Sequence, residues 1–179
     1  LLAEVADQAG LPAGVLNLVV GPAAAVGPAI TTARAVRAIS FTGSTAAGEQ
    51  IHRGAGLTTR TQMELGGKNP LIVLADADLD RAVDLAVKGG FSLSGQACTG
   101  TSRVLVDAKV RQAFTDKLVA RVKTLTLGNG LDGNFDLGPL ATRKQLDNVL
   151  SYVAVGKEEA THLCLSLIHI SEPTRQEAI

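Results

Sequence analysis

The sequence predicts an α/β fold with largely parallel strands. Short apolar runs of strand length alternate along the chain with longer segments of helical pattern. Turn residues such as glycine and proline stand where these helices and strands should end. Short strands that alternate with helices are typical of a parallel sheet covered by helices.

The first elements follow from local signals in chain order. Residues 1–12 have a helical pattern that ends in a glycine and a proline. Residues 15–21, VLNLVVG, predict a short buried strand, and residues 23–36 are weakly helical because a Gly-Pro pair interrupts them. Residues 37–44 predict a strand that runs into a glycine turn, and residues 44–55 the helix that follows.

The same alternation continues through the rest of the chain. The predicted strands are residues 61–67, 70–76 and 102–107, and the predicted helices are residues 78–91, 108–125 and 143–159. A loop, GNGLDGNFDLGP at residues 128–139, separates the last two helices. The residues show no internal repeat and no run of charge.

Composition excludes several classes of protein. The 179 residues are 46% hydrophobic and 19% charged, as in an ordinary soluble globular chain. The 17 basic and 17 acidic residues cancel, which argues against binding of nucleic acid or a membrane surface. No apolar stretch approaches the roughly 18 residues of a membrane helix. Two cysteines exclude a disulfide framework and favour a reducing, cytoplasmic location.

Residues 41–48, FTGSTAAG, place Gly43 and Gly48 at a strand-to-helix turn that Ser44 opens. Free backbone N–H groups and the helix dipole make such a turn suitable for phosphate. The turn lacks the Lys-Ser/Thr pair of a P-loop and is not G-x-G-x-x-G. Spacing alone therefore leaves a dinucleotide-binding turn and a tight packing turn equally open.

Cys98 and Glu64 are the candidate catalytic pair. Cys98 stands among small residues in SGQACTGTSR, which leaves its sulfur reachable, although a lone cysteine is often a small buried hydrophobe. Glu64 is the only carboxylate in QMELGGKNP and can act as a general base at a strand end, unless it is simply an exposed glutamate. Neither His52 nor His162 has a comparable setting.

The acidic stretch ADADLDRAVD resembles a metal cluster. Helix capping explains it better, with Asp76 or Asp78 as the N-cap and further acidic residues in the first turn. We therefore expect no metal site.

The segments FTGSTAAG, ELGGKNP and GQACTGTSR, in this order, resemble the core motifs of the NAD(P)-dependent aldehyde dehydrogenase superfamily. Cys98 follows Glu64 by 98 − 64 = 34 positions, which also matches the family. The form GQACTGTSRVLV is similar to that of bacterial 2-oxoglutarate-semialdehyde dehydrogenases.

The resemblance implies a role for each matching residue. Cys98 would be the nucleophile, with its N–H as half of an oxyanion hole, and Glu64 the general base that hydrolyses a thioester. The cofactor would be NAD or NADP, the substrate an aldehyde, and the parent enzyme a dimer or tetramer of identical chains. The implied cofactor-binding residues are Thr42, Gly43, Ser44, Gly48, Leu65, Gly66 and Gly27. Four positions before Gly27, Ala23 stands where the family more usually has glycine.

The resemblance also predicts the domain organisation. Residues 1–65 would be the C-terminal part of a Rossmann-like NAD(P)-binding domain, and residues 66–164 the first half of an α/β catalytic domain. The family's oxyanion-hole asparagine and its ribose-binding segments have no counterpart in the sequence, and its single methionine is Met63. We therefore expect a fragment that is inactive alone.

The last residues form a separate segment. LSLIHISEPTR, residues 165–175, resembles a translated transposase-type sequencing adapter, and QEAI would come from the index bases that follow. We expect residues 165–179 to lie outside the fold. Two alternatives to a dehydrogenase remain open: a non-catalytic nucleotide-binding or structural module, and a thiol hydrolase or acyltransferase that uses Cys98.

Overall fold

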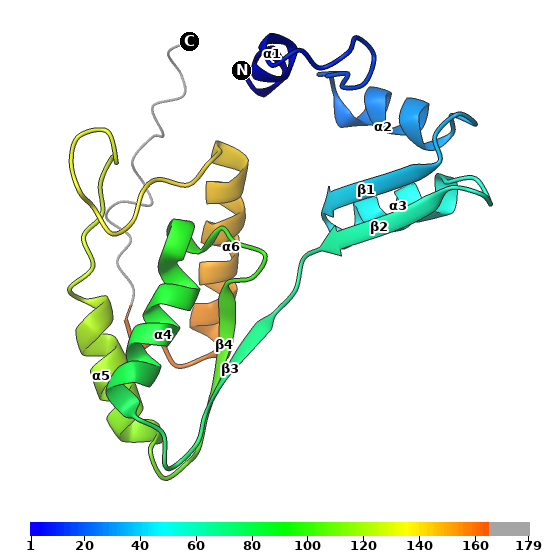
Figure 1. Ribbon diagram of the computed structural model, residues 1–179. Coiled ribbons are helices and arrows are strands. Elements are labelled where there is room, and N and C mark those ends of the chain that lie inside the picture. Colours follow the sequence, from blue (N-terminus) through cyan, green and yellow to red (C-terminus); the bar gives the residue numbers. More distant parts are fainter. Residues whose placement is uncertain (165–179) are drawn as a thin grey trace. The chain divides into compact units, whose positions relative to one another are not determined.

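The computed structural model describes residues 1–164 (Figure 1). It divides into two compact units, Leu1–Gly66 and a second that begins at Gly67. Each unit pairs parallel strands and packs helices against them, so the α/β class with parallel strands is confirmed. The adapter-like segment, residues 165–179, lies outside the described residues.

The first unit is built around a strand–helix–strand motif (Figure 1). Its elements are α1 (Leu2–Gln8), α2 (Ala23–Thr31), β1 (Ala38–Gly43), α3 (Thr45–Gly54) and β2 (Arg60–Leu65). β1 and β2 are parallel and in register from Ala38 opposite Arg60 to Gly43 opposite Leu65. Side chains alternate along both strands between half-buried and exposed positions, because successive residues of a strand point to opposite faces.

The predicted strand at residues 15–21 is wrong. No strand among the described residues pairs with this segment, and Leu18, Val19 and Val20 are exposed. A strand is stabilised by backbone hydrogen bonds to a neighbour, so an apolar run without a neighbour stays irregular. The other predicted strands and helices of this unit are confirmed, including α2 with Pro28 inside it.

The second unit contains the apolar core. Its elements are β3 (Asn69–Val73), α4 (Leu79–Phe91), the 3₁₀ turn η1 (Ser92–Gly95), β4 (Thr101–Val106), α5 (Arg111–Val122) and α6 (Arg143–Glu159). β3 and β4 are parallel, and a register shift between Asn69 and Pro70 leaves Ser102 without an opposite residue. The parallel pair comes from strands on either side of α4, as predicted.

The buried face of α4 follows from its sequence. Val83 and Val87, four positions apart, lie on one side of the helix beside Ala82 and Ala86 and pack with Val73 of β3. Phe114 of α5, 2% exposed, completes this cluster. Burial of each large side chain contributes about 1.5–3 kcal/mol, so this cluster stabilises the packing of α4 and α5 on β3.

The N-terminus of α4 shows why the acidic stretch is a cap. The Asp78 side chain accepts hydrogen bonds from the N–H groups of Asp80 and Arg81, at 3.0 and 3.1 Å. The prediction of an N-cap is therefore confirmed at Asp78. Within residues 1–164, no helix combines the length and the apolar character that crossing a membrane requires.

Candidate active site

The carboxyl ends of β1 and β2 gather most of the predicted cofactor residues of the first unit. Thr42 lies opposite Glu64, and Gly43 lies opposite Leu65. Gly66 follows directly after β2, and Ser44 follows directly after β1. Because parallel strands end at the same sheet edge, residues from FTGSTAAG and ELGGKNP meet there although about twenty positions separate them.

Gly48 sets how closely α3 approaches β2. It is buried, and a Cβ added to it would lie 2.7 Å from Cδ2 of Leu65. At Gly43 a Cβ would lie 2.4 Å from Cζ of the Phe41 ring. A side chain at either position would displace its neighbour, Leu65 or Phe41, so both glycines have the packing role that the sequence left open. A packing role does not compete with phosphate binding, since it holds the helix terminus at the strand ends.

The N-terminus of α3 is suited to an anion. The Ser44 hydroxyl caps the helix by accepting from the Ala47 N–H at 3.3 Å. The preceding first-turn N–H groups have no partner inside a helix, and the dipole makes this end positive. The first turn of α3, Thr45–Gly48, has no acidic side chain that would repel an anion.

Gly27 stands apart from this edge in the structure. It lies inside α2 beside Pro28 and is half-buried. Nothing lies within 4 Å of the position that a Cβ would take. Close packing therefore does not explain a glycine at this position, and its assignment to a cofactor stays a prediction.

Cys98 lies on a loop of the second unit, between η1 and β4, and its side chain is exposed. The turn η1 leads into this loop with three consecutive residues in left-handed conformation: Leu93, Ser94 and Gly95 have φ of 53°, 57° and 72°. This conformation costs roughly 1–2 kcal/mol for each residue other than glycine. Sequence patterns miss such a turn, because neither leucine nor serine is typical of it.

Asn69 joins two of the sequence motifs. Its side-chain N–H₂ donates to the carbonyl of Cys98 at 2.8 Å and to the carbonyl of Gly100 at 3.4 Å. Asn69 belongs to ELGGKNP and Cys98 to GQACTGTSR, so the first motif holds the backbone of the second. Sequence reasoning did not single out Asn69; its place at the start of a strand, inside a motif already selected, was the available signal.

Gly89, near the end of α4, and Gly100, in the Cys98 loop, allow close approach between the helix, the loop and β4. A Cβ on Gly89 would lie 2.4 Å from Oγ1 of Thr101 and 3.2 Å from its Cβ. A Cβ on Gly100 would lie 3.1 Å from the carbonyl oxygen of Ala97, whose partner is the Gly100 N–H. The small residues around Cys98 therefore allow the loop to turn tightly against the helix end.

A loop after α5 is closed at its neck by Asp136. The Asp136 carboxylate accepts from the N–H and the hydroxyl of Thr126, both at 2.8 Å. These two bonds, in that order, lower the pKa of Asp136 below its usual range, and the charge of Arg121 adds to the effect. The Leu137 N–H donates to the Thr126 carbonyl at 3.0 Å, and the Gly128 N–H to the Leu137 carbonyl at 3.0 Å.

The candidate catalytic residues lie in different units. Glu64 is exposed near the end of β2 in the first unit, and Cys98 is exposed in the second. Among residues 1–164, no three His, Cys, Asp or Glu side chains group as metal ligands would. His52 instead lies with Nδ1 3.0 Å from the Thr61 hydroxyl, on the face of β2 that α3 covers.

Comparison with known proteins decides the family. The model of the "Aldehyde dehydrogenase family" matches residues 1–176. The chain belongs to the aldehyde dehydrogenase family.

Three aldehyde dehydrogenase relatives give the extent of the likeness. Alpha-ketoglutaric semialdehyde dehydrogenase of Bacillus subtilis is 44% identical over 160 residues, which are 89% of this chain and 33% of the relative. Betaine aldehyde dehydrogenase of Staphylococcus aureus, solved in complex with NAD⁺, is 35% identical with a TM-score of 0.88, and the likeness covers 97% of this chain and 34% of that one.

The third relative is 3,6-anhydro-L-galactose dehydrogenase, solved in complex with NAP. It is 36% identical with a TM-score of 0.85, over 88% of this chain and 33% of that one. The chain thus spans about a third of the length of the aldehyde dehydrogenases that it matches.

Proposed function

We propose that this chain is the part of an NAD(P)-dependent aldehyde dehydrogenase that carries the nucleophile, Cys98, and the general base, Glu64. The observation that carries this proposal is the exposed thiol of Cys98, on a loop whose backbone Asn69 of the neighbouring family motif holds. An accessible thiol can react as a thiolate with an aldehyde carbon. The alternative of a non-catalytic structural module predicts a buried Cys98, whereas Cys98 is exposed.

The proposed reaction consists of an addition, a hydride transfer and a hydrolysis. The Cys98 thiolate adds to the aldehyde carbon, forming a C–S bond and an alkoxide that the Cys98 backbone N–H stabilises. NAD(P)⁺, when bound, would accept the hydride from the former aldehyde carbon, and loss of this hydride leaves a thioester on Cys98. Glu64 then takes a proton from water, the hydroxide adds to the thioester, and the C–S bond breaks. The products are a carboxylic acid, NAD(P)H, a proton and the restored thiol.

The residues at the ends of β1 and β2 fit a dinucleotide. Gly48 allows α3 to pack directly on Leu65, and the capped, acid-free N-terminus of α3 presents N–H groups to a pyrophosphate. Thr42, Gly43, Ser44 and Gly48 would hold the phosphates, with Leu65 and Gly66 beside the nicotinamide. Gly27 would lie on the adenosine side. Relatives solved with NAD⁺ and with NAP support either cofactor.

The 44% identity with alpha-ketoglutaric semialdehyde dehydrogenase makes 2-oxoglutarate semialdehyde the first substrate to test. The sequence resemblance to that group supports the same choice. We also propose a cytoplasmic homo-oligomer for the whole enzyme. The exposed cysteine supports a reducing compartment, and size-exclusion chromatography of the whole enzyme would test its oligomeric state.

The proposal is tested with the chain in a Cys164→Ser background. We expect iodoacetamide to alkylate Cys98 faster than the same cysteine in the free peptide SGQACTGTSR, with a rate that rises with pH. A Cys98→Ser variant, which keeps Cys164, is the matched control. A Cys98 rate no higher than that of the free peptide would contradict the proposed role.

Turnover separates the remaining alternatives. We expect the purified 179-residue chain to form no NADH from the semialdehyde, since the family's other cofactor and oxyanion groups have no counterpart in its sequence. In the whole enzyme, Cys98→Ala should abolish NADH formation, and Glu64→Gln should slow hydrolysis by about 10²–10⁴-fold. Hydrolysis of activated esters without cofactor, at a rate that exceeds aldehyde oxidation, would favour the thiol hydrolase instead.

A further inference from the structure

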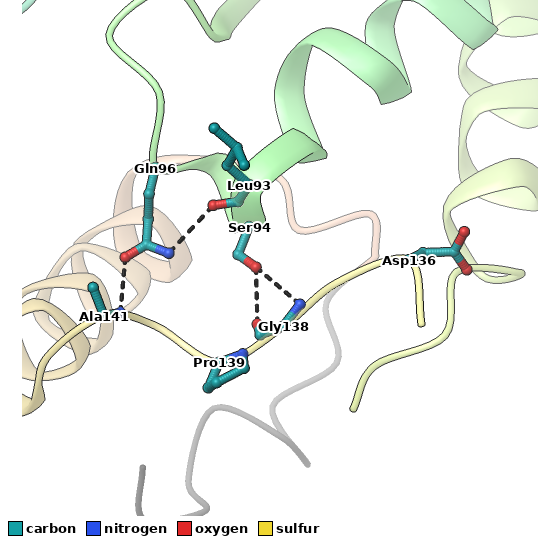
Figure 2. A pocket seen from close by; sticks show the side chains of 7 residues that line it. All are labelled: Leu93, Ser94, Gln96, Asp136, Gly138, Pro139 and Ala141. Carbon is teal, nitrogen blue, oxygen red and sulfur yellow. Dashed lines mark hydrogen bonds between the residues drawn. The ribbon is translucent and has the colours of Figure 1, made fainter. Parts of the chain in front are cut away.

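A set of hydrogen bonds joins the loop of Cys98 to residues 136–141 (Figure 2). The Ser94 hydroxyl donates to the Gly138 carbonyl at 2.8 Å and accepts from the Gly138 N–H at 3.1 Å. The Gln96 side chain accepts from the Ala141 N–H at 3.0 Å and donates to the Leu93 carbonyl at 3.2 Å. We call these four bonds the loop clamp. The Ser94 and Gln96 side chains each donate one hydrogen bond and accept another. Each side chain is therefore held by two bonds.

The loop clamp acts on the left-handed turn of residues 93–95. Left-handed residues other than glycine persist only where the surroundings determine their conformation more strongly than local preference does. Ser94 is itself left-handed and is tied at its side chain. Gln96 closes the turn, because its side chain and its backbone N–H both donate to the Leu93 carbonyl, at 3.2 and 3.1 Å.

The other end of the loop clamp is itself anchored. The neck bonds between Asp136 and Thr126 hold the start of residues 136–141. Thr142, directly after the segment, caps α6 by accepting from the Gln145 N–H at 3.2 Å. The segment therefore runs between two fixed points and can serve as a support for the Cys98 loop.

Cys98 lies between this clamp and Asn69. Gln96 is two residues before Cys98, and Asn69 holds the Cys98 carbonyl from β3. Two supports on either side of one residue fix the direction of its backbone. They thus restrict where the Cys98 backbone N–H points, which is the geometry that oxyanion stabilisation needs.

We propose that Ser94 and Gln96 are positioning residues, which orient the Cys98 loop by holding its left-handed turn against residues 136–141. The proposal rests on the proposed function of Cys98. Neither side chain touches the reacting atoms in this role. Their effect is on the number of conformations that the Cys98 backbone adopts.

The test uses the Cys164→Ser chain with substitutions at the loop clamp. Gln96→Met keeps the length of the side chain and removes both of its hydrogen bonds, whereas Gln96→Glu keeps the acceptor for the Ala141 N–H. Ser94→Gly tolerates the left-handed conformation and removes the hydroxyl. Gln112→Met and Ser151→Gly are matched controls, because both residues are exposed on other helices and bond within their own helix.

Two readouts are measured for each variant. Peptide-level hydrogen exchange covers residues 91–102 and 134–142, and iodoacetamide alkylation of Cys98 is compared with the free peptide. We expect Gln96→Met and Ser94→Gly each to raise the rate of hydrogen exchange in both peptides by about tenfold. The exchange rate of Gln96→Glu should lie between that of Gln96→Met and that of the unsubstituted chain. Alkylation should move toward the free-peptide rate in the same order, and the controls should change neither readout.

Each outcome decides one proposal. If Cys98 of the unsubstituted chain reacts no faster than the free peptide, the proposed function fails, and the hydrogen exchange still judges the loop clamp. If Cys98 is fast but the clamp variants leave exchange and alkylation unchanged, the loop clamp is refuted. If circular dichroism shows that a variant does not fold, the loop clamp is tested in the unsubstituted chain instead. There the Gly138 and Ala141 amides should be protected from hydrogen exchange, and unprotected amides would overturn the proposal.

Discussion

Removal of the Asn69 side chain should loosen the backbone that carries Cys98. In Asn69→Ala the carbonyl groups of Cys98 and Gly100 lose the Asn69 N–H₂, which donates to them at 2.8 and 3.4 Å. A neutral hydrogen bond contributes about 0.5–1.5 kcal/mol, and the longer contact counts for less than the shorter. We therefore expect a loss of about 1–2 kcal/mol in the free energy of unfolding, and a fall in Tm of roughly 4–8 °C for each kcal/mol.

A second substitution at the same position sharpens the test. Asn69→Asp keeps the size of the side chain but turns a carboxylate oxygen toward two carbonyl oxygens, so it should destabilise more than Asn69→Ala. Asn148→Ala, at an exposed position of α6, is the control and should change the free energy of unfolding by no more than about 0.5 kcal/mol. Thermal unfolding followed by circular dichroism gives the order. If Asn69→Asp proves as stable as the unsubstituted chain, the assignment of its donor role is wrong.

Three further predictions concern the same unit. Gly89→Ala should cost about 1–3 kcal/mol by denaturant unfolding, because its Cβ would meet Oγ1 of Thr101 at 2.4 Å; a neutral result would mean that Thr101 moves freely. Phe114→Ala, which empties a position that is 2% exposed, should cost about 3–5 kcal/mol, and a loss under 1 kcal/mol would show that the core collapses to fill it. The lowered pKa of Asp136 stabilises the fold above the usual aspartate range of about pH 4, and this stabilisation is lost as the pH falls through the folded-state pKa. The Tm difference between the original chain and Asp136→Asn should therefore shrink on acidification below pH 4, and a constant difference from pH 7 to pH 2 would contradict the role of Thr126.

Most helices and strands could be predicted because residues at their own ends mark where they begin and stop. The changeovers between strand and helix carry glycines and caps, and Asp78 caps α4 as its acidic neighbours indicate. The prediction of a strand at residues 15–21 was wrong because a strand needs a neighbouring strand, and the local sequence pattern does not show whether one is present. The left-handed turn at Leu93 and Ser94 also escaped, since the hydrogen bonds that hold it come from residues more than forty positions away.

The candidate site divides in the same way. Cys98, Glu64 and the glycine turn stood out because reactive residues among small neighbours have a recognisable pattern. Asn69, Ser94 and Gln96 did not, because an ordinary polar residue acquires its role only from the partner that folding brings to it. The catalytic roles of Cys98 and Glu64 stay predictions that alkylation and turnover test, and the cofactor-binding roles of the glycine turn stay predictions as well.

The span of the Asn69 bond has a consequence for folding kinetics. Asn69 and Cys98 are separated by 29 positions, so we expect their bond to close after α4 has brought β3 and β4 together. Closing a loop of this length costs entropy, so we expect the bond to form after the transition state. Its loss should then speed unfolding while refolding keeps its rate. We expect stopped-flow measurements on Asn69→Ala to show this asymmetry, and slower refolding would contradict it. The backbone that carries the thiol would then be set in place late in folding and released early in unfolding.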